Sequence, residues 1–164
     1  MITNRPSRLA GVSYVGFQRY SVTACTAYRR PVFTDAAIVD PARAAFYDTA
    51  AEFEFEATVS CFMADHLHLL LIAQSERSDL CRCIKKAKQK SGFAYKQSFG
   101  RSLWQPGYHD RILRNDEATL TVVRYILENP IRAGLAKALG EYPFASSAVY
   151  TLEELLAAWE RQEQ

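Results

Sequence analysis

The chain has 164 residues, of which 49% are hydrophobic and 23% charged, and its formal net charge is +2. This composition is ordinary for a globular protein and gives room for one hydrophobic core. No apolar run is long enough to cross a bilayer, and the N-terminus lacks the apolar segment of a secretory signal, so we expect a cytoplasmic protein with no membrane partner.

The four cysteines show no regular disulfide pattern; they are Cys25, Cys61, Cys81 and Cys83. The pair Cys81 and Cys83 lies in a basic helical stretch and has no second pair with which to complete a zinc site. We therefore interpret all four as reduced thiols.

The small net charge hides a strong segregation along the chain. Residues 1–34 contain five basic and no acidic residues, and residues 77–114 contain ten basic and two acidic residues, whereas 35–76 and 115–164 are net acidic. Two basic blocks that fold together would form a surface suited to phosphate. A solvated helix face explains such a run equally well, and on charge alone it is the preferred explanation.

The first half of the chain predicts three strands and one helix. Residues 14–27 are rich in β-branched and aromatic side chains, which predicts a strand. Asp40 followed by proline predicts the start of a helix over 40–53. Alternating hydrophobicity predicts a second strand over 54–64, and the apolar run 66–74 predicts a third strand after a short turn at Ala64 and Asp65.

The second half begins with a long basic helix. Ser78 or Asp79 caps this helix, which continues to about residue 98 and ends at Gly100. Residues 102–114 predict a fourth strand, interrupted at Pro106 and Gly107.

Asn115 predicts the cap of a further helix, which breaks or kinks at Asn129 and Pro130 and continues for a turn or two over 131–138. Residues 141–150 are irregular. The order of elements predicts a ferredoxin-like β-α-β-β-α-β antiparallel α+β sheet, with an extra catalytic helix after the fourth strand. We expect a single domain over 1–164, with a core at about 14–150 and a short C-terminal helix at 151–162.

Two of the three histidines lie two residues apart in the third predicted strand. Residues i and i+2 of a strand share a face, so His66 and His68 project together while Leu67 faces the other side. Two neutral imidazoles side by side can bind a divalent ion. For an isolated pair, the alternative that each ring has its own structural partner is the commoner one.

A metal site needs a third ligand, and the predicted helix after the fourth strand offers Tyr125 and Asn129. At i and i+4 they lie on one helix face, and a phenol and an amide oxygen facing the histidines would suit phosphoryl transfer. However, Asn129 before Pro130 is also a natural cap, and Tyr125 could simply pack. Spacing alone leaves these alternatives open.

The runs "MADHLHLLL", "LWQPGYHDRILRNDE" and "YILENPIRAGL", in this order, resemble the single-tyrosine HUH transposases, and most of all the REP-associated tyrosine transposases. The opening "RYSVTACTAYRRPVF" is also similar to the first strand of that family and the segment after it, so the resemblance spans roughly residues 14–150. One departure is Ala64, where many relatives have proline; we expect it to affect only the turn.

The resemblance implies a role for each matched position. His66 and His68 match the metal-binding pair, Tyr125 matches the nucleophile, and Asn129 matches the third ligand, which is asparagine in the REP-associated branch. It further implies Mg²⁺ or Mn²⁺ as cofactor and single-stranded or hairpin DNA as substrate. The tyrosine would attack the phosphorus and leave a 5′-phosphotyrosine and a free 3′-hydroxyl. The enzyme would act as a monomer or a homodimer.

With such a site, the basic segments become a predicted DNA-contacting surface. The predicted residues are Arg19, Arg29, Arg30, Lys85, Lys86, Lys88, Lys90, Arg101, Arg111 and Arg114. Phe93, Tyr95 and Trp104 are candidates for base stacking, although core packing is the preferred interpretation of Trp104. Tyr108 is the nearest competing tyrosine, and His109 is predicted not to be a ligand. Asp65 is either a support for an imidazole or a turn residue.

Three functions therefore compete. The first is a metal-dependent DNA endonuclease and strand transferase. The second is a non-catalytic nucleic-acid-binding protein that retains the transposase fold, and the third is a ferredoxin-like scaffold with structural histidines. The presence of all four candidate site residues favours the first.

Overall fold

The structure is a computed structural model in which residues 11–161 are described. Five strands form one antiparallel sheet in the order β4-β1-β3-β2-β5. The strands are β1 (Arg19–Cys25), β2 (Phe55–Met63), β3 (His66–Ala73), β4 (His109–Leu113) and β5 (Ala145–Ser146). The first four have the ferredoxin-like order, which confirms the predicted α+β fold.

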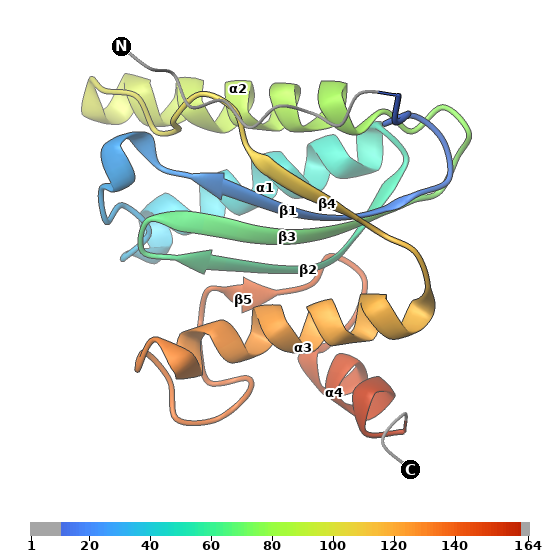
Figure 1. The fold of residues 1–164 in the computed structure, drawn as a ribbon. Helices are drawn as coiled ribbons and strands as arrows, with labels where there is room; N and C mark the ends of the chain where they lie inside the picture. The colour runs from blue at the N-terminus through green and yellow to red at the C-terminus, as the bar shows by residue number, and fades with distance from the viewer. Residues whose placement is uncertain (1–10, 162–164) are drawn as a thin grey trace.

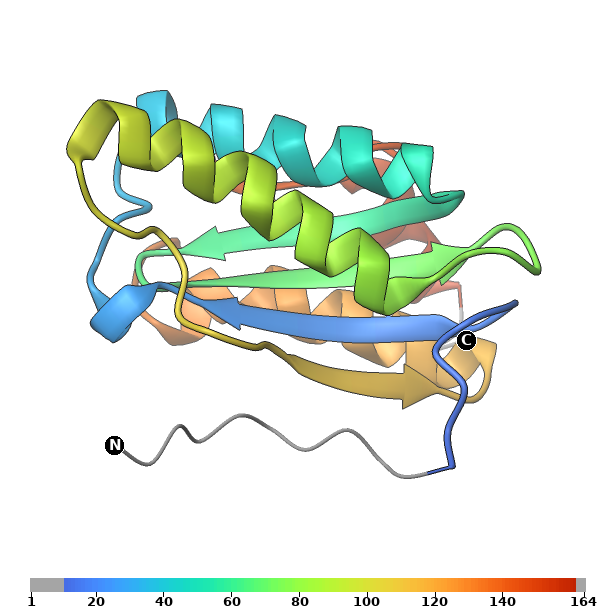
Figure 2. The same cartoon turned by 90° about the horizontal axis from the view of Figure 1, so that it is seen from above.

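The helices cover both faces of this sheet (Figure 1). They are α1 (Ala36–Glu52), α2 (Leu80–Phe99), α3 (Asp116–Arg132) and α4 (Leu152–Glu160), with a short 3-10 helix η1 (Ala27–Arg29). Figure 2 shows α1 and α2 on one side of the sheet and α3 on the other. The extra helix predicted after the fourth strand is therefore α3. It shares its side of the sheet with α4.

Alternating side chains of the strands divide the interior into two cores. Leu67, Leu69 and Leu71 of β3 pack in the core under α1 and α2, whereas Leu70 packs in the core under α3 and α4. Each fully buried leucine contributes about 1.5–3 kcal/mol. Because β3 is covered on both faces, its sequence is an almost continuous apolar run, and its two histidines stand out within it.

Two predicted helix boundaries are wrong. Helix α1 begins at Ala36 and not at Asp40, because the Asp35 side chain accepts a hydrogen bond from the Ala37 N–H at 2.8 Å and caps the helix there. Helix α3 does not break at Asn129 but continues to Arg132 with Pro130 inside it. Proline removes only one N–H from the helix, and the burial of neighbours such as Ile126 holds this segment in place.

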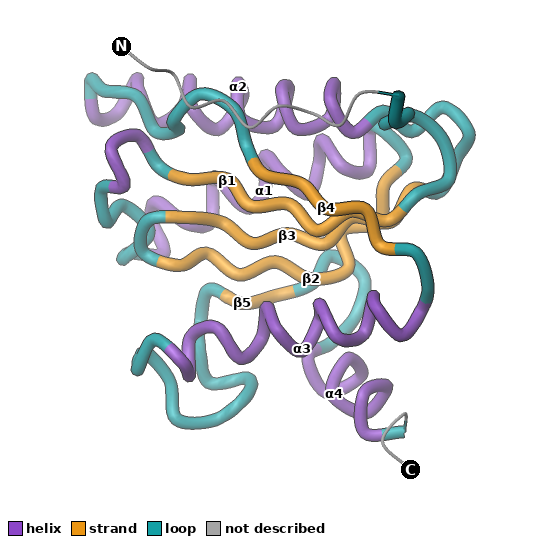
Figure 3. Tube along the Cα trace, in the orientation of Figure 1, coloured by secondary structure: helices purple, strands orange, loops and turns teal. Residues whose placement is uncertain are grey.

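The strand predictions need a similar correction. Only Arg19–Cys25 of the predicted 14–27 is β1, and only His109–Leu113 of the predicted 102–114 is β4. The segment before β4 is a loop (Figure 3), joined to the end of β1 where Ala27 N–H donates to Leu103 C=O at 2.8 Å. The two-residue β5 was not predicted at all, because a pairing this short leaves no periodic pattern in the sequence.

The cap of α2 at Asp79 and its left-handed end at Gly100 are as predicted. The basic residues Arg5 and Arg8 and the predicted helix end at 162 lie outside the described residues. Over residues 11–161, none of the helices combines the length and the apolar character needed to cross a membrane.

Candidate active site

The histidine pair lies on the face of the sheet that α3 covers. His66 and His68 are half-buried, and their Nε2 atoms are 3.0 Å apart. The intervening Leu67 points into the opposite core. The i and i+2 spacing in β3 therefore brings the two rings together, as the sequence predicts.

Each ring is held through its other nitrogen. The Nδ1 of His66 donates to Asp65 Oδ1 at 2.6 Å, and the Nδ1 of His68 is 3.1 Å from the hydroxyl of Thr23 on β1. Arg29 in turn donates through Nε to Asp65 Oδ2 at 2.9 Å. Such partners orient an imidazole and leave Nε2 available as a ligand. The two Nε2 atoms lie 3.0 Å apart, within hydrogen-bond distance of each other.

The electrostatic environment keeps His68 in the neutral form that binds cations. Burial, assisted by the positive charges of His66, Arg132 and Arg29, lowers the pKa of His68 to about 4. His68 is consequently neutral at pH 7. Burial alone would raise the pKa of Asp65, but the hydrogen bond from His66 and the charge of Arg29 outweigh it and lower that pKa.

Tyr125 reaches the pair from α3. Its ring packs edge-on against His68, with ring centroids 5.9 Å apart and an interplanar angle of 81°, and its side chain is half-exposed. The guanidinium of Arg132 lies 4.4 Å from the Tyr125 ring centroid, and its Nη2 donates to the Tyr125 carbonyl at 2.7 Å. The phenol is thus held between an imidazole and a cation while it remains open to a substrate.

Asn129 lies one helical turn beyond Tyr125. Because α3 is continuous there, the i and i+4 positions share a face. The Nδ2 of Asn129 is buried, and within the described part of the chain it has no hydrogen-bond partner. Buried amides are normally satisfied, so this one is unusual. Residues 11–161 contain no group of three or more His, Cys, Asp or Glu that could hold a metal ion, so the predicted ligand set of His66, His68 and Asn129 stays a prediction.

Three of the ten predicted DNA-contacting residues lie on the site side of the sheet: Arg19 and Arg29 pair with Asp116 and Asp65, and Arg111 lies opposite Ser21 of β1. Arg19 is 2.5 Å from Asp116 at the start of α3, and Arg30 donates to the Ser102 carbonyl. Arg111 of β4 and Arg114 after it are exposed.

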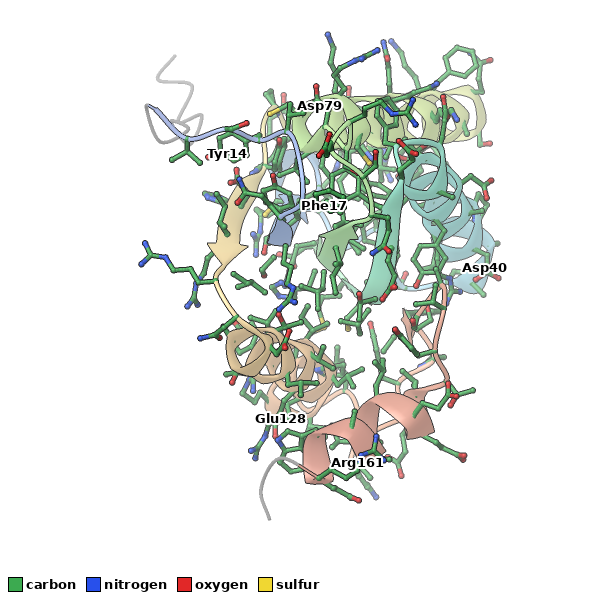
Figure 4. The ribbon with its side chains drawn as sticks, turned by 90° about the vertical axis from the view of Figure 1, so that its right-hand side faces the viewer. Tyr14, Phe17, Asp40, Asp79, Glu128 and Arg161 are labelled. Carbon is green, nitrogen blue, oxygen red and sulfur yellow. The ribbon has the colours of Figure 1, made fainter. Side chains whose placement is uncertain are left out.

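Five of the other predicted contacts are separated from the histidines by the sheet. They are Lys85, Lys86, Lys88 and Lys90 on α2, with Arg101 just beyond it. Figure 4 shows this separation, with the labelled Asp79, which caps α2, and Glu128 of α3 on opposite sides. The structure therefore does not gather the ten residues into one patch.

The remaining aromatic and histidine candidates divide by burial. Tyr95 and Trp104 belong to the core under α1 and α2, and Tyr108 packs against it, whereas Phe93 is exposed. His109 is exposed at the start of β4.

The residues that sequence reasoning missed are Thr23 and Arg132. Thr23 is found only through the strand register, which pairs it with His68. Arg132 had a signal, since it follows Tyr125 by seven residues and so returns to the same helix face.

The sequence of this chain is similar to those of known proteins. The sequence matches the IS200-like transposase family over residues 15–129. It is 24% identical over 122 residues to a Haemophilus influenzae protein assigned to the REP-associated tyrosine transposases, covering 63% of this chain and 65% of that protein, which is just under two thirds of its length.

Two solved structures have a similar fold. One is a REP-associated tyrosine transposase bound to a REP hairpin, with a TM-score of 0.70 at 19% identity, covering 85% of this chain and 82% of that one. The other is a Deinococcus radiodurans protein classed as a transposase, with a TM-score of 0.52 at 24% identity, covering 73% of this chain and 95% of that one. Since the family match spans most of the sequence, this chain belongs to the IS200-like transposase family.

Proposed function

We propose that this protein is a metal-dependent single-stranded DNA endonuclease and strand transferase that acts on hairpin-bearing DNA, with Tyr125 as nucleophile. The observation that carries the proposal is the packing of the half-exposed Tyr125 ring on His68, where the two imidazole Nε2 atoms meet. A purely structural histidine pair does not require an exposed phenol at the same point.

The residues suit a transesterification. The Tyr125 oxygen would attack the scissile phosphorus as the bond to the 3′ oxygen breaks, giving a 5′-phosphotyrosine and a 3′-hydroxyl that takes up a proton. One phosphodiester replaces another, so the step is reversible and needs no external energy. Arg132 restrains the phenol, and the partners of the two Nδ1 atoms fix both rings.

We propose His66, His68 and Asn129 as the residues that would hold Mg²⁺ or Mn²⁺. The donor set fits because the two Nε2 atoms lie 3.0 Å apart, His68 is neutral, and Asn129 on the same helix face as Tyr125 carries an amide oxygen that could serve as the third ligand. When bound, such an ion neutralises charge on the phosphate and polarises its oxygens.

The decisive experiment detects the covalent intermediate. Labelled hairpin DNA incubated with the protein and Mn²⁺ is expected to give an adduct that survives denaturation, and Tyr125→Phe is expected to abolish the adduct while DNA binding persists. Tyr28→Phe is the matched control, because Tyr28 is an exposed tyrosine that the proposal does not use. An adduct that persists in Tyr125→Phe would refute the assigned nucleophile. DNA binding without any adduct would instead favour the non-catalytic binding protein.

A further inference from the structure

A groove lies between α2 and the Ser102–Pro106 loop, on the side of the sheet away from the histidines. Its volume is about 410 Å³, which is enough for a group of the size of a small molecule but too small for a DNA duplex. We call it the α2 groove and define it by six of its lining residues: Lys85, Gly92, Phe93, Lys96, Trp104 and Pro106. The Ser102–Pro106 loop forms one wall and is joined to the end of β1 next to the histidine pair.

The cations of α2 divide into those with partners and those without. Lys86 and Lys90 pair with Glu52, and Lys88 donates to the carbonyls of Gln105 and Gly107. The guanidinium of Arg82 lies over the ring of Phe53.

Lys85 and Lys96 are the two α2 cations for which the described residues provide no such partner, and both line the groove. They are eleven residues apart, so they lie three turns apart on one helix face, about 16 Å along the axis. Their charges are therefore available to an anionic ligand that runs along this face.

The groove also has an exposed aromatic ring. The Phe93 side chain is 67% exposed, an unusual state for a phenylalanine, and it lines the groove between the two lysines. Trp104 forms the opposite wall and is fixed by its indole N–H, which donates to Ser91 Oγ at 2.9 Å. Gly92 lines the floor without a side chain, and a Cβ there would lie in ordinary contact with Trp104 at 3.6 Å, so only a larger side chain would fill the floor.

We propose that the α2 groove binds an unpaired nucleotide of the DNA, with the base stacked on Phe93 and the neighbouring phosphates bound by Lys85 and Lys96. Exposed aromatic rings flanked by cations are how proteins bind single strands without sequence readout. The inference rests on the proposed function, because it assumes that the DNA carries unpaired nucleotides. It gives the α2 face a role separate from that of the histidine face.

The test measures binding of a fluorescent oligothymidine of about 12 nucleotides, a length within the range of single-strand sites. All variants carry Tyr125→Phe so that no covalent adduct forms. Phe93→Ala is expected to weaken binding roughly 5- to 150-fold, from the loss of one stacked base, and Phe93→Trp to preserve it. Gly92→Leu is expected to weaken binding by filling the floor, and Gly92→Ala, which adds only a methyl in ordinary contact, serves as its folding control.

The lysines are tested through the salt dependence. Lys85→Gln and Lys96→Gln should each reduce the slope of log affinity against log salt by about 0.7, the value for one phosphate of a single strand. Arg77→Gln removes the same charge from a residue paired with Glu54 and should leave the slope unchanged.

If Phe93→Ala and Gly92→Leu bind oligothymidine with the same affinity as the protein without these changes, the proposal that the α2 groove binds a nucleotide is refuted. If these variants lose binding but the wild-type protein forms no adduct with hairpin DNA, the groove is supported and the nuclease assignment fails. If the adduct forms and the groove variants bind oligothymidine normally, the nuclease assignment is supported and the proposal that the α2 groove binds a nucleotide is refuted.

Discussion

Replacing Asp65 by asparagine should weaken metal binding without moving a ligand. Asp65 accepts from His66 Nδ1 at 2.6 Å through one oxygen and from Arg29 Nε at 2.9 Å through the other. An amide has a single oxygen, so whichever way it turns, it loses one of these two contacts and it also loses the negative charge. Removal of such a partner typically lowers metal affinity about 10- to 100-fold, or about 1.4–2.7 kcal/mol.

The measurement is calorimetric titration of the DNA-free protein with Mn²⁺, with circular dichroism to verify the fold. Asp40→Asn is the matched control, because Asp40 is also paired with an arginine but lies on α1, away from the site (Figure 4). We expect Asp40→Asn to bind Mn²⁺ like the unaltered protein. An unchanged affinity in Asp65→Asn would show that the carboxylate does not support His66, and would refute the reasoning.

Three further predictions concern side chains that hold the site and the groove. Arg132→Ala removes a cation–π contact with Tyr125 worth about 0.5–2 kcal/mol, so it should slow adduct formation at saturating DNA by up to about 30-fold while DNA affinity is retained, and Arg132→Lys should recover part of the rate. Ser91→Ala leaves the buried indole N–H of Trp104 without its acceptor, and urea denaturation should show a loss of about 1–3 kcal/mol. Asn115→Ala removes the side chain that accepts from the first turn of α3; thermal melting should show a loss of about 1 kcal/mol, and an unchanged melting temperature would mean that the cap is not needed.

The separation of the basic residues has a consequence for how DNA would lie on the protein. The α2 groove and the histidine pair are on opposite faces of the sheet, and the Ser102–Pro106 loop and β4 form the edge between them. One DNA strand that reached both sites would have to pass around this edge, where Arg111 is exposed. The affinity for single-stranded DNA should therefore rise with the length of the strand until the strand is long enough to reach both sites around this edge.

The sequence by itself determined the order of strands and helices and the pairing of the two histidines. Strand alternation fixes that His66 and His68 share a face, and the capping residues Asp79 and Asn115 fix where two helices begin. These are local properties, set by neighbours within a few positions along the chain.

Only the tertiary structure decided which side chains from distant parts of the sequence contact each other. The course of α3 through Pro130 depends on packing against the sheet, and the contact of Thr23 with His68 depends on strand register between segments 45 residues apart. Which lysines of α2 are paired depends on where Glu52 of α1 and the carbonyls of Gln105 and Gly107 lie. Such contacts join residues distant in sequence, so no local pattern encodes them, and they decide which charges remain available to a ligand.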